Sequence, residues 1–304
     1  METRLRLHAA AAALAAALNT AYAHDTWFAP LPSDTAGSVA LALGTGNQFP
    51  MHESGIGIEH LLHSGCRAEP GSAPLTLQRS ADAPRALHLR VRADGSRGLT
   101  CWAQTSAFDV QLADDKIALY LRDIQASAAV RDAWAQMRAR GVPWKERYTK
   151  HARIELNAGA TAAAPVNMAM DVLLEAPQHA PRRGDTLQFR VLRDGRPLPD
   201  FAVELRGDKL PIGIWRKTNA EGQVQIPAPL PGRWVLRGTD LRLSERESDT
   251  WESRFVTLAF EVASEDEMPR GQAASSDKPN ARSTSQMPAT PAINTEPPAI
   301  TARR

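Results

Sequence analysis

The sequence has no strong excess of charge of either sign, and long apolar runs are missing beyond its first two dozen residues. Thirty-six lysine and arginine residues face 34 aspartate and glutamate residues, which leaves a formal net charge of +2. This balance excludes a strongly basic surface, so we expect no nucleic-acid partner. The missing apolar runs exclude a later membrane span. The chain also lacks a G-x-S-x-G, a P-loop and a glycine-rich dinucleotide motif, and we expect no enzymatic activity.

Cysteine is scarce, with two residues in the chain, Cys66 and Cys101. In an oxidising compartment an even pair is interpreted first as one disulfide bond. Such a bond would stabilise the fold by about 3–4 kcal/mol in the chain-entropy model. Two buried thiols or a thiolate metal site are the alternatives.

The first 23 residues have the pattern of a secretory signal. Arg4 and Arg6 form a positively charged start, and residues 9–18 form a short apolar run. Ala21-Tyr22-Ala23 matches the small-x-small cleavage pattern, which predicts that the mature protein begins at His24. An uncleaved apolar anchor is the alternative. We therefore expect an exported protein, in a bacterial periplasm, with no membrane span after cleavage.

Residues 24–176 are expected to form a β-rich domain, because short runs with partial alternation and turn residues fill much of this part. Within it, apolar residues at helical spacing predict a helical insertion at about 113–150. The insertion is expected to contain two helices with a break near Ala126–Ser127.

The remainder of the chain divides into a second β domain and a tail. Residues 177–263 show cleaner strand alternation and turn dipeptides such as Asp194-Gly195, which predicts a small β-sandwich. Residues 264–304 are rich in Ser, Pro, Ala and Thr and poor in large apolar residues, so we expect a disordered tail. The predicted fold class is therefore mainly β.

Cleavage before His24 would create a chelating N-terminus. The α-amine and the imidazole Nδ1 of one histidine can close a six-membered ring on a divalent metal. The ordinary pKa of the amine is about 7.7–8.0, so a metal can displace its proton near neutral pH. Nickel and copper favour nitrogen donors. Asp25 could add a carboxylate ligand or orient the imidazole. The alternative is that the new terminus frays and binds nothing.

A terminal histidine needs partners. His52 is the preferred second ligand, because it lies in a Gly/Pro-flanked loop that suggests an accessible side chain. Trp27 and Phe28 are expected to anchor the first strand against the core. That anchoring would hold the terminal amine in place.

Six segments spread over residues 24–263 carry a family resemblance. They read AHDTWFAP, LGTGNQFP, ERYTKHARIELNAG, GDTLQFRVLRDGRPLPDFAVEL, TNAEGQVQIPAPLPGRWVLRG and DTWESRFVTLAFEV. Together and in this order they resemble the DUF4198 family of bacterial periplasmic proteins. The resemblance implies an N-terminal β-rich domain with a helical insertion, followed by a transthyretin- or immunoglobulin-like β-sandwich. It also implies metal handling, since some members are described as components of nickel or cobalt uptake.

The resemblance places the family's terminal histidine and its acidic neighbour at His24 and Asp25. In the family, the segment after the first strand often reads G-H-x-F-P. Here Asn47 stands where that histidine would be, and His52 lies five residues further on. This departure moves the second ligand to His52.

Three functional hypotheses follow. The first is a non-enzymatic periplasmic protein that binds Ni(II) or Co(II) through His24 and passes the metal to an uptake transporter in the inner membrane. The second is a copper-binding protein or copper enzyme with a histidine brace, in which His52 or His151 faces His24. The third is a structural interaction module in which the β-sandwich binds a protein partner and no metal.

Overall fold

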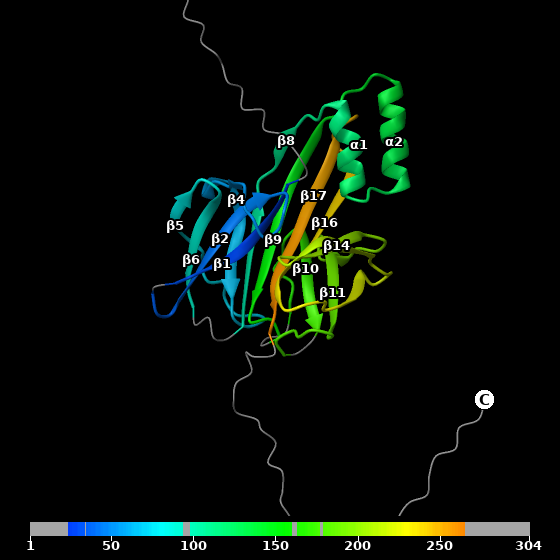
Figure 1. Cartoon of the computed structure of the whole chain (residues 1–304). Helices are drawn as coiled ribbons and strands as arrows, with labels where there is room; N and C mark the ends of the chain where they lie inside the picture. Colours follow the sequence, from blue (N-terminus) through cyan, green and yellow to red (C-terminus); the bar gives the residue numbers. More distant parts are fainter. Residues whose placement is uncertain (1–23, 34, 94–97, 160–162, 177–178, 265–304) are drawn as a thin grey trace, which may run out of the picture. The chain divides into compact units, whose positions relative to one another are not determined.

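The computed structural model of the chain describes residues 24–33, 35–93, 98–159, 163–176 and 179–264. The signal predicted at 1–23 and the tail predicted at 264–304 lie outside these residues, except for Ser264. Within them the fold is mainly β with two α-helices, as the sequence predicts (Figure 1). No helix in the described part of the chain is long and apolar enough to cross a membrane.

Eight strands form a central sheet with the order β14-β13-β16-β17-β9-β7-β4, and β8 pairs with β9. β17 and β9 run parallel, while the other pairs in this sheet are antiparallel. The strands from before residue 177 are β4 (Leu61–Arg67), β7 (Leu99–Thr105), β8 (Phe108–Val110) and β9 (Glu146–Leu156). Those from after it are β13 (Ala202–Gly207), β14 (Leu210–Lys217), β16 (Gly232–Leu243) and β17 (Trp251–Val262). Residues on both sides of the expected domain boundary therefore share one sheet.

Two smaller sheets complete the β structure, and a single turn of 3₁₀-helix (Ile58–His60) precedes β4. The first has the order β1-β2-β6-β5, with β3 paired to β2. Its strands are β1 (Asp25–Leu31), β2 (Ser38–Gly46), β3 (Ser54–Gly55), β5 (Gln78–Ala83) and β6 (Ala86–Arg92). The second has the order β10-β11-β12, with β15 paired to β11. Its strands are β10 (Met170–Ala176), β11 (Thr186–Arg193), β12 (Arg196–Pro197) and β15 (Gln223–Pro227).

The predicted turn at Asp194-Gly195 joins β11 to β12. Its two residues have φ values of 51° and 74°. A two-residue hairpin loop of type I′ needs positive φ at both positions, which Asp and Gly tolerate better than most residues. The dipeptide therefore specified this hairpin locally.

The two small sheets pack on opposite faces of the central sheet. On β17, Val256 and Leu258 share a core with Phe189 of β11. Ala259 instead shares a core with Phe28 of β1. Because successive side chains of a strand point to opposite faces, this alternation places the β1 sheet on one face and the β11 sheet on the other.

The predicted disulfide bond joins Cys66 of β4 to Cys101 of β7. The two residues lie directly opposite each other in the ladder. Both are fully buried in the core that contains Phe28. The bond therefore links neighbouring strands beneath the sheet that carries β1.

The helices α1 (Asp114–Asp123) and α2 (Ala128–Ala139) lie side by side at one end of the sheet (Figure 1). The break predicted near Ala126–Ser127 is confirmed, since the Ser127 side chain caps α2 by accepting a hydrogen bond from Val130 N at 3.3 Å. The helical insertion expected to reach about residue 150 ends earlier. Residues 146–150 already belong to β9, because pairing with β17 on one side and β8 on the other overrides their local helical pattern.

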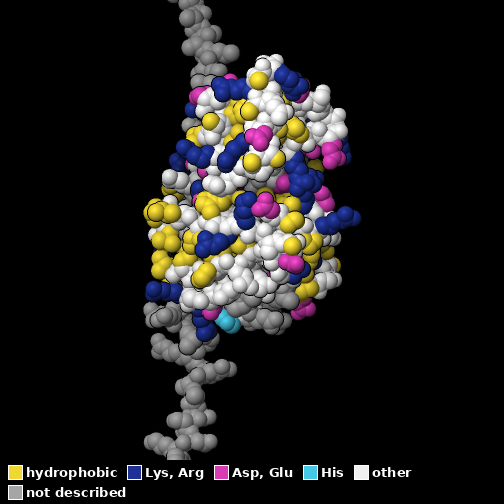
Figure 2. Space-filling view, turned by 90° about the vertical axis from the view of Figure 1, so that its right-hand side faces the viewer, with side chains coloured by type: hydrophobic (Ala, Val, Ile, Leu, Met, Phe, Trp, Pro, Cys, Tyr) yellow, Lys and Arg dark blue, Asp and Glu magenta, His cyan; other side chains and the backbone are white. Residues whose placement is uncertain are grey.

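The surface carries charges of both signs. On the face seen in Figure 2, Lys and Arg side chains are interspersed with Asp and Glu side chains. The large hydrophobic side chains exposed in the described residues are Met51, Leu62, Leu119, Ile212 and Leu243.

Glu146 is a buried carboxyl group that connects the helices to the central sheet. It accepts hydrogen bonds from Tyr120 Oη on α1 at 2.8 Å, from Trp144 Nε1 at 2.9 Å and from the Ser253 hydroxyl of β17. The Trp144 ring stacks on Trp251 with a centroid distance of 5.0 Å. Burial raises the pKa of Glu146, while the three donated hydrogen bonds lower it.

We predict that Glu146→Ala lowers the free energy of unfolding by about 3 kcal/mol or more, because three buried donors lose their acceptor. Chemical denaturation followed by tryptophan fluorescence measures the change. Glu146→Gln, which keeps an acceptor oxygen, should lose less. Glu221→Ala, at an exposed position, should stay within about 0.5 kcal/mol of the wild type. Equal losses for the Glu146→Ala and Glu221→Ala variants would contradict the prediction.

Candidate metal site

β1 places the predicted N-terminal residue at the edge of a folded layer. Asp25 pairs with Gly46 as the first step of the β1–β2 ladder. His24 precedes that pair and Asn47 follows it, so the two residues lie across from each other at the end of the ladder. Trp27 and Phe28 are almost completely buried, which confirms that they anchor the strand.

A buried lysine holds the backbone of His24. Lys150 of β9 donates a hydrogen bond from Nζ to the His24 carbonyl oxygen at 2.9 Å. Its ammonium group also lies over the rings of Tyr148, at 5.5 Å, and Phe255, at 6.0 Å. Burial lowers the pKa of Lys150 to about 8, partly opposed by the negative charge of Asp25. The start of β1 is thus fixed on the central sheet rather than left to fray.

The Asp25 carboxylate is fixed by a buried arginine. Arg237 of β16 donates from Nη1 to Asp25 Oδ2 at 2.8 Å and from Nε to Glu204 Oε2 of β13 at 2.6 Å. Its Nη2 lies 3.4 Å from Asp123 Oδ1 at the end of α1. One guanidinium therefore joins β1, β13 and α1, and the Trp215 ring lies beside it at 5.7 Å. The second Asp25 oxygen, Oδ1, is buried without a hydrogen-bond partner.

Burial also shapes the titration of the acidic and imidazole groups. Burial raises the pKa of Asp25, and the positive charge of Arg237 partly offsets this rise. Burial lowers the pKa of His24, and the positive charge of Lys150 lowers it further. The negative charges of Glu53 and Asp25 partly offset this shift. A lowered pKa keeps the imidazole of His24 neutral at neutral pH, which is the form that binds metal.

Glu53 is a charged group near His24 that sequence reasoning did not select. Asn47 holds its carboxylate through two hydrogen bonds of 3.2 Å, one from the backbone N and one from the side-chain Nδ2. The pairing of β1, β2 and β3 brings this segment beside the start of β1. The only sequence signal was its place next to His52.

His52 lies against Trp27. Its Nε2 is 3.1 Å from the Trp27 carbonyl oxygen, and the two rings are 5.2 Å apart. Gly44 makes room for it, because a Cβ at that position would lie 2.4 Å from His52 Cγ. Burial lowers the pKa of His52. The structure thus brings His52 to the strand that begins after His24, with one ring nitrogen engaged by the backbone.

His151 points away from His24. It follows Lys150 on β9, so its side chain lies on the opposite face of the central sheet. Its Nδ1 donates a hydrogen bond to the Phe255 carbonyl oxygen at 3.0 Å. Burial lowers the pKa of His151 to about 4. Among the described residues no group of three or more His, Cys, Asp and Glu side chains is arranged to hold a metal ion.

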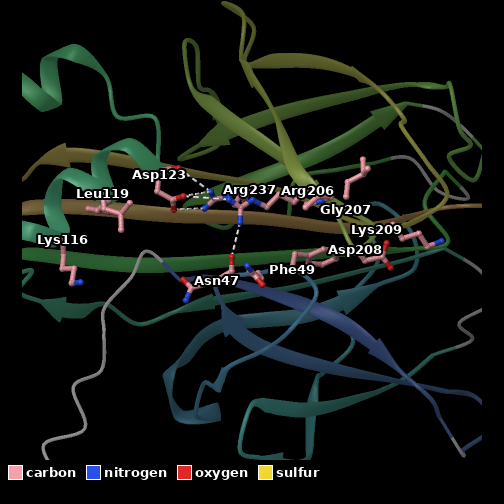
Figure 3. A pocket seen from close by; sticks show the side chains of 14 residues that line it. Asn47, Phe49, Lys116, Leu119, Asp123, Arg206, Gly207, Asp208, Lys209 and Arg237 are labelled. Carbon is pink, nitrogen blue, oxygen red and sulfur yellow. Dashed lines mark hydrogen bonds and ion pairs between the residues drawn. The ribbon is translucent and has the colours of Figure 1, made fainter.

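A pocket of about 630 Å³ is lined in part by Arg237, the residue that binds Asp25. Figure 3 shows it between α1, the β13–β14 hairpin and the segment that contains Asn47 and Phe49. Arg237 and Arg206 line it from the strand side, and Lys116 and Leu119 line it from α1.

We predict that Arg237→Ala lowers the free energy of unfolding by about 3–5 kcal/mol, because buried carboxylates lose their cation. The matched control is Arg233→Ala, on the same strand, whose ion pair with Asp208 is partly exposed. That change should stay within about 1 kcal/mol of the wild type. Urea denaturation measures the free energy of unfolding of both variants. Similar losses for Arg237→Ala and Arg233→Ala would contradict the prediction.

The buried His151 should make stability depend on pH. The unfolded histidine binds a proton below its ordinary pKa of 6.5, whereas the folded one stays neutral down to about 4. The wild type should therefore lose up to about 3 kcal/mol relative to His151→Gln as the pH falls from 7 to 4, at 1.36 kcal/mol per unit of pKa shift. His179→Gln, at an exposed histidine, should follow the wild type. The prediction is contradicted if the free energy of unfolding depends on pH in the same way for the wild type and for His151→Gln.

Comparison with known proteins supports a family assignment. No curated protein matches the chain. One matching solved structure, the D0-D1 domain of Intimin, is 9% identical, and the alignment covers 78% of this chain and 97% of that one. Its TM-score of 0.18 is too low to support any structural argument. A model of the family DUF4198, described as a domain of unknown function, matches residues 21–239, and the chain therefore belongs to the DUF4198 family.

Proposed function

We propose that this chain is an exported, non-enzymatic protein that binds Ni(II) or Co(II) through His24 as its first mature residue. The observation that carries the proposal is the environment of that residue. Its carbonyl oxygen is held by Lys150, and the adjacent Asp25 carries a buried oxygen, Oδ1, without a hydrogen-bond partner. A buried acceptor of this kind is costly unless a cation or a donor satisfies it.

The available donors fit a divalent metal of the late first row. Cleavage after Ala23 would supply the α-amine, and His24 would add its neutral imidazole. Asp25 Oδ1 or the carboxylate of Glu53 would add one oxygen donor. Nitrogen and carboxylate ligands together suit nickel, cobalt and copper. The imidazole is only partly buried, which suits a metal that must enter and leave.

A periplasmic location agrees with this chemistry. The Cys66–Cys101 bond is stable in an oxidising compartment. We propose that the receiving partner is an uptake transporter in the inner membrane. A copper brace would need a second imidazole at the amine. His151 lies on the other face of the sheet, and His52 already contacts the Trp27 carbonyl through Nε2, so these positions favour nickel or cobalt.

The proposal predicts that protein beginning at His24 binds Ni(II) or Co(II) with a Kd of about 1 µM or lower in isothermal titration. Cu(II) is titrated in parallel to rank the metals. Extension by Gly-Ser-Gly-Ser before His24 should weaken binding at least tenfold, because it converts the amine to a peptide nitrogen. A four-residue extension avoids placing histidine second or third, where it would form a different amine chelate.

His24→Ala should lose binding to the same extent, while His179→Ala, at an exposed histidine, should bind as the wild type does. Mass spectrometry of the exported protein checks that it begins at His24. Equal affinity of the extended and mature proteins would overturn the proposal, as would a mature start at another residue.

A further inference from the structure

A second cavity, of about 240 Å³, lies between the β1 sheet and the central sheet. Its lining comprises residues 28–30 of β1, Val39 of β2, Phe49 and Pro50 of the segment after β2, and the ends of β9, β16 and β17. It shares Phe49 with the pocket that Arg237 lines. The cavity lies toward the end of β1, whereas His24 precedes the start of that strand, so it is separate from the candidate metal site.

The walls of this cavity are apolar where β1 lies beside β9 and β17 (Figure 1). Phe28, Ile154 and Ala259 belong to the core that fills the space between the two sheets. Val39 and Leu156 pack against that core but are only half-buried. The cavity is thus an extension of the core that the side chains of the described residues leave unfilled.

Phe49 and Pro50 add a further apolar wall from outside both sheets. The Phe49 ring packs edge-on against Trp27, with a centroid distance of 5.7 Å. Because Trp27 is itself buried in β1, this contact holds the wall in place.

The charged residues of the lining lie at the rim or point away from the cavity. Arg233 and Glu261 are exposed partners opposite each other on β16 and β17. Arg233 also donates from Nε to Asp208 Oδ2 at 3.2 Å. The Glu155 carboxylate accepts a hydrogen bond from Arg153 Nε at 2.7 Å. Its side chain lies on the opposite face of β9 from its apolar neighbours in the strand, so the cavity wall itself is uncharged.

An apolar wall of this kind selects its occupant by polarity. Water gains little there, because a stable buried water needs two to four polar partners. An ion would lose its hydration without gaining a partner of opposite charge. An apolar molecule gains by removing its own surface and that of the wall from water. An apolar cavity of about 150 Å³ already holds a benzene ring, so this larger one has room for a bigger ring system.

We propose that this cavity binds a small uncharged apolar molecule, with a body of one or two aromatic rings or a branched carbon skeleton of that size. The occupant packs between Phe28 and Phe49 and leaves the charges of Arg233 and Glu261 in solvent at the rim. The site is independent of the metal proposed at His24, because the two occupy different parts of β1.

Isothermal titration of the exported protein with 1-naphthol and with 1-naphthalenesulfonate at pH 7 tests the inference. The two probes share one ring system, and only the second carries a charge. Val39→Trp and Leu156→Trp each fill the cavity from a half-buried position. The matched control is Val130→Trp, a half-buried valine of α2 outside the lining. Circular dichroism checks that the three variants are folded.

We expect one 1-naphthol per protein with a Kd of about 100 µM or lower, and binding of the sulfonate at least tenfold weaker. Both filling variants should bind 1-naphthol at least tenfold more weakly than the wild type, and the control should match the wild type. Equal affinity for the two probes would overturn the inference, as would unchanged affinity in both filling variants or no binding by the wild type. His24→Ala should bind 1-naphthol as the wild type does, so failure of the metal proposal leaves this result unaffected.

Discussion

The contact between Arg237 and Asp25 determines how the start of β1 is held. It joins β16 to β1 in a buried environment, and the same guanidinium reaches Glu204 and Asp123. A buried charge is tolerated only where its partners are closely placed, so these contacts constrain four elements at once. The position of His24, and the wall shared with the adjacent pocket, follow from this constraint.

The central sheet makes that arrangement possible, because it combines strands from distant parts of the chain. β9 and β17 pair in parallel, although about a hundred residues separate them. This pairing brings Lys150 under the His24 carbonyl and Ser253 to Glu146. The sheet thus supports the candidate metal site on the face that carries β1, and the helices extend the same face.

Part of the site could be predicted from local sequence and part could not. Trp27 and Phe28 are a local signal, since large apolar side chains are expected in the core and both are buried. Lys150 and Arg237 carry none, since each is an ordinary charged residue in its own segment, and the only signal at Glu53 is its place next to His52. The expected extension of the helical insertion to about residue 150 was wrong for a related reason, because strand partners from far along the chain determine the conformation of residues 146–150.

By itself, the sequence determined the β class, the two helices with their break at Ser127, the Asp194-Gly195 hairpin and a single possible disulfide pair. These features depend on residue type and short-range periodicity. Only the tertiary structure decided which charges meet, because Asp25 and Arg237 are 212 positions apart. Their contact depends on strand register and on the packing of one sheet against another, and neither is encoded in any short segment of the chain.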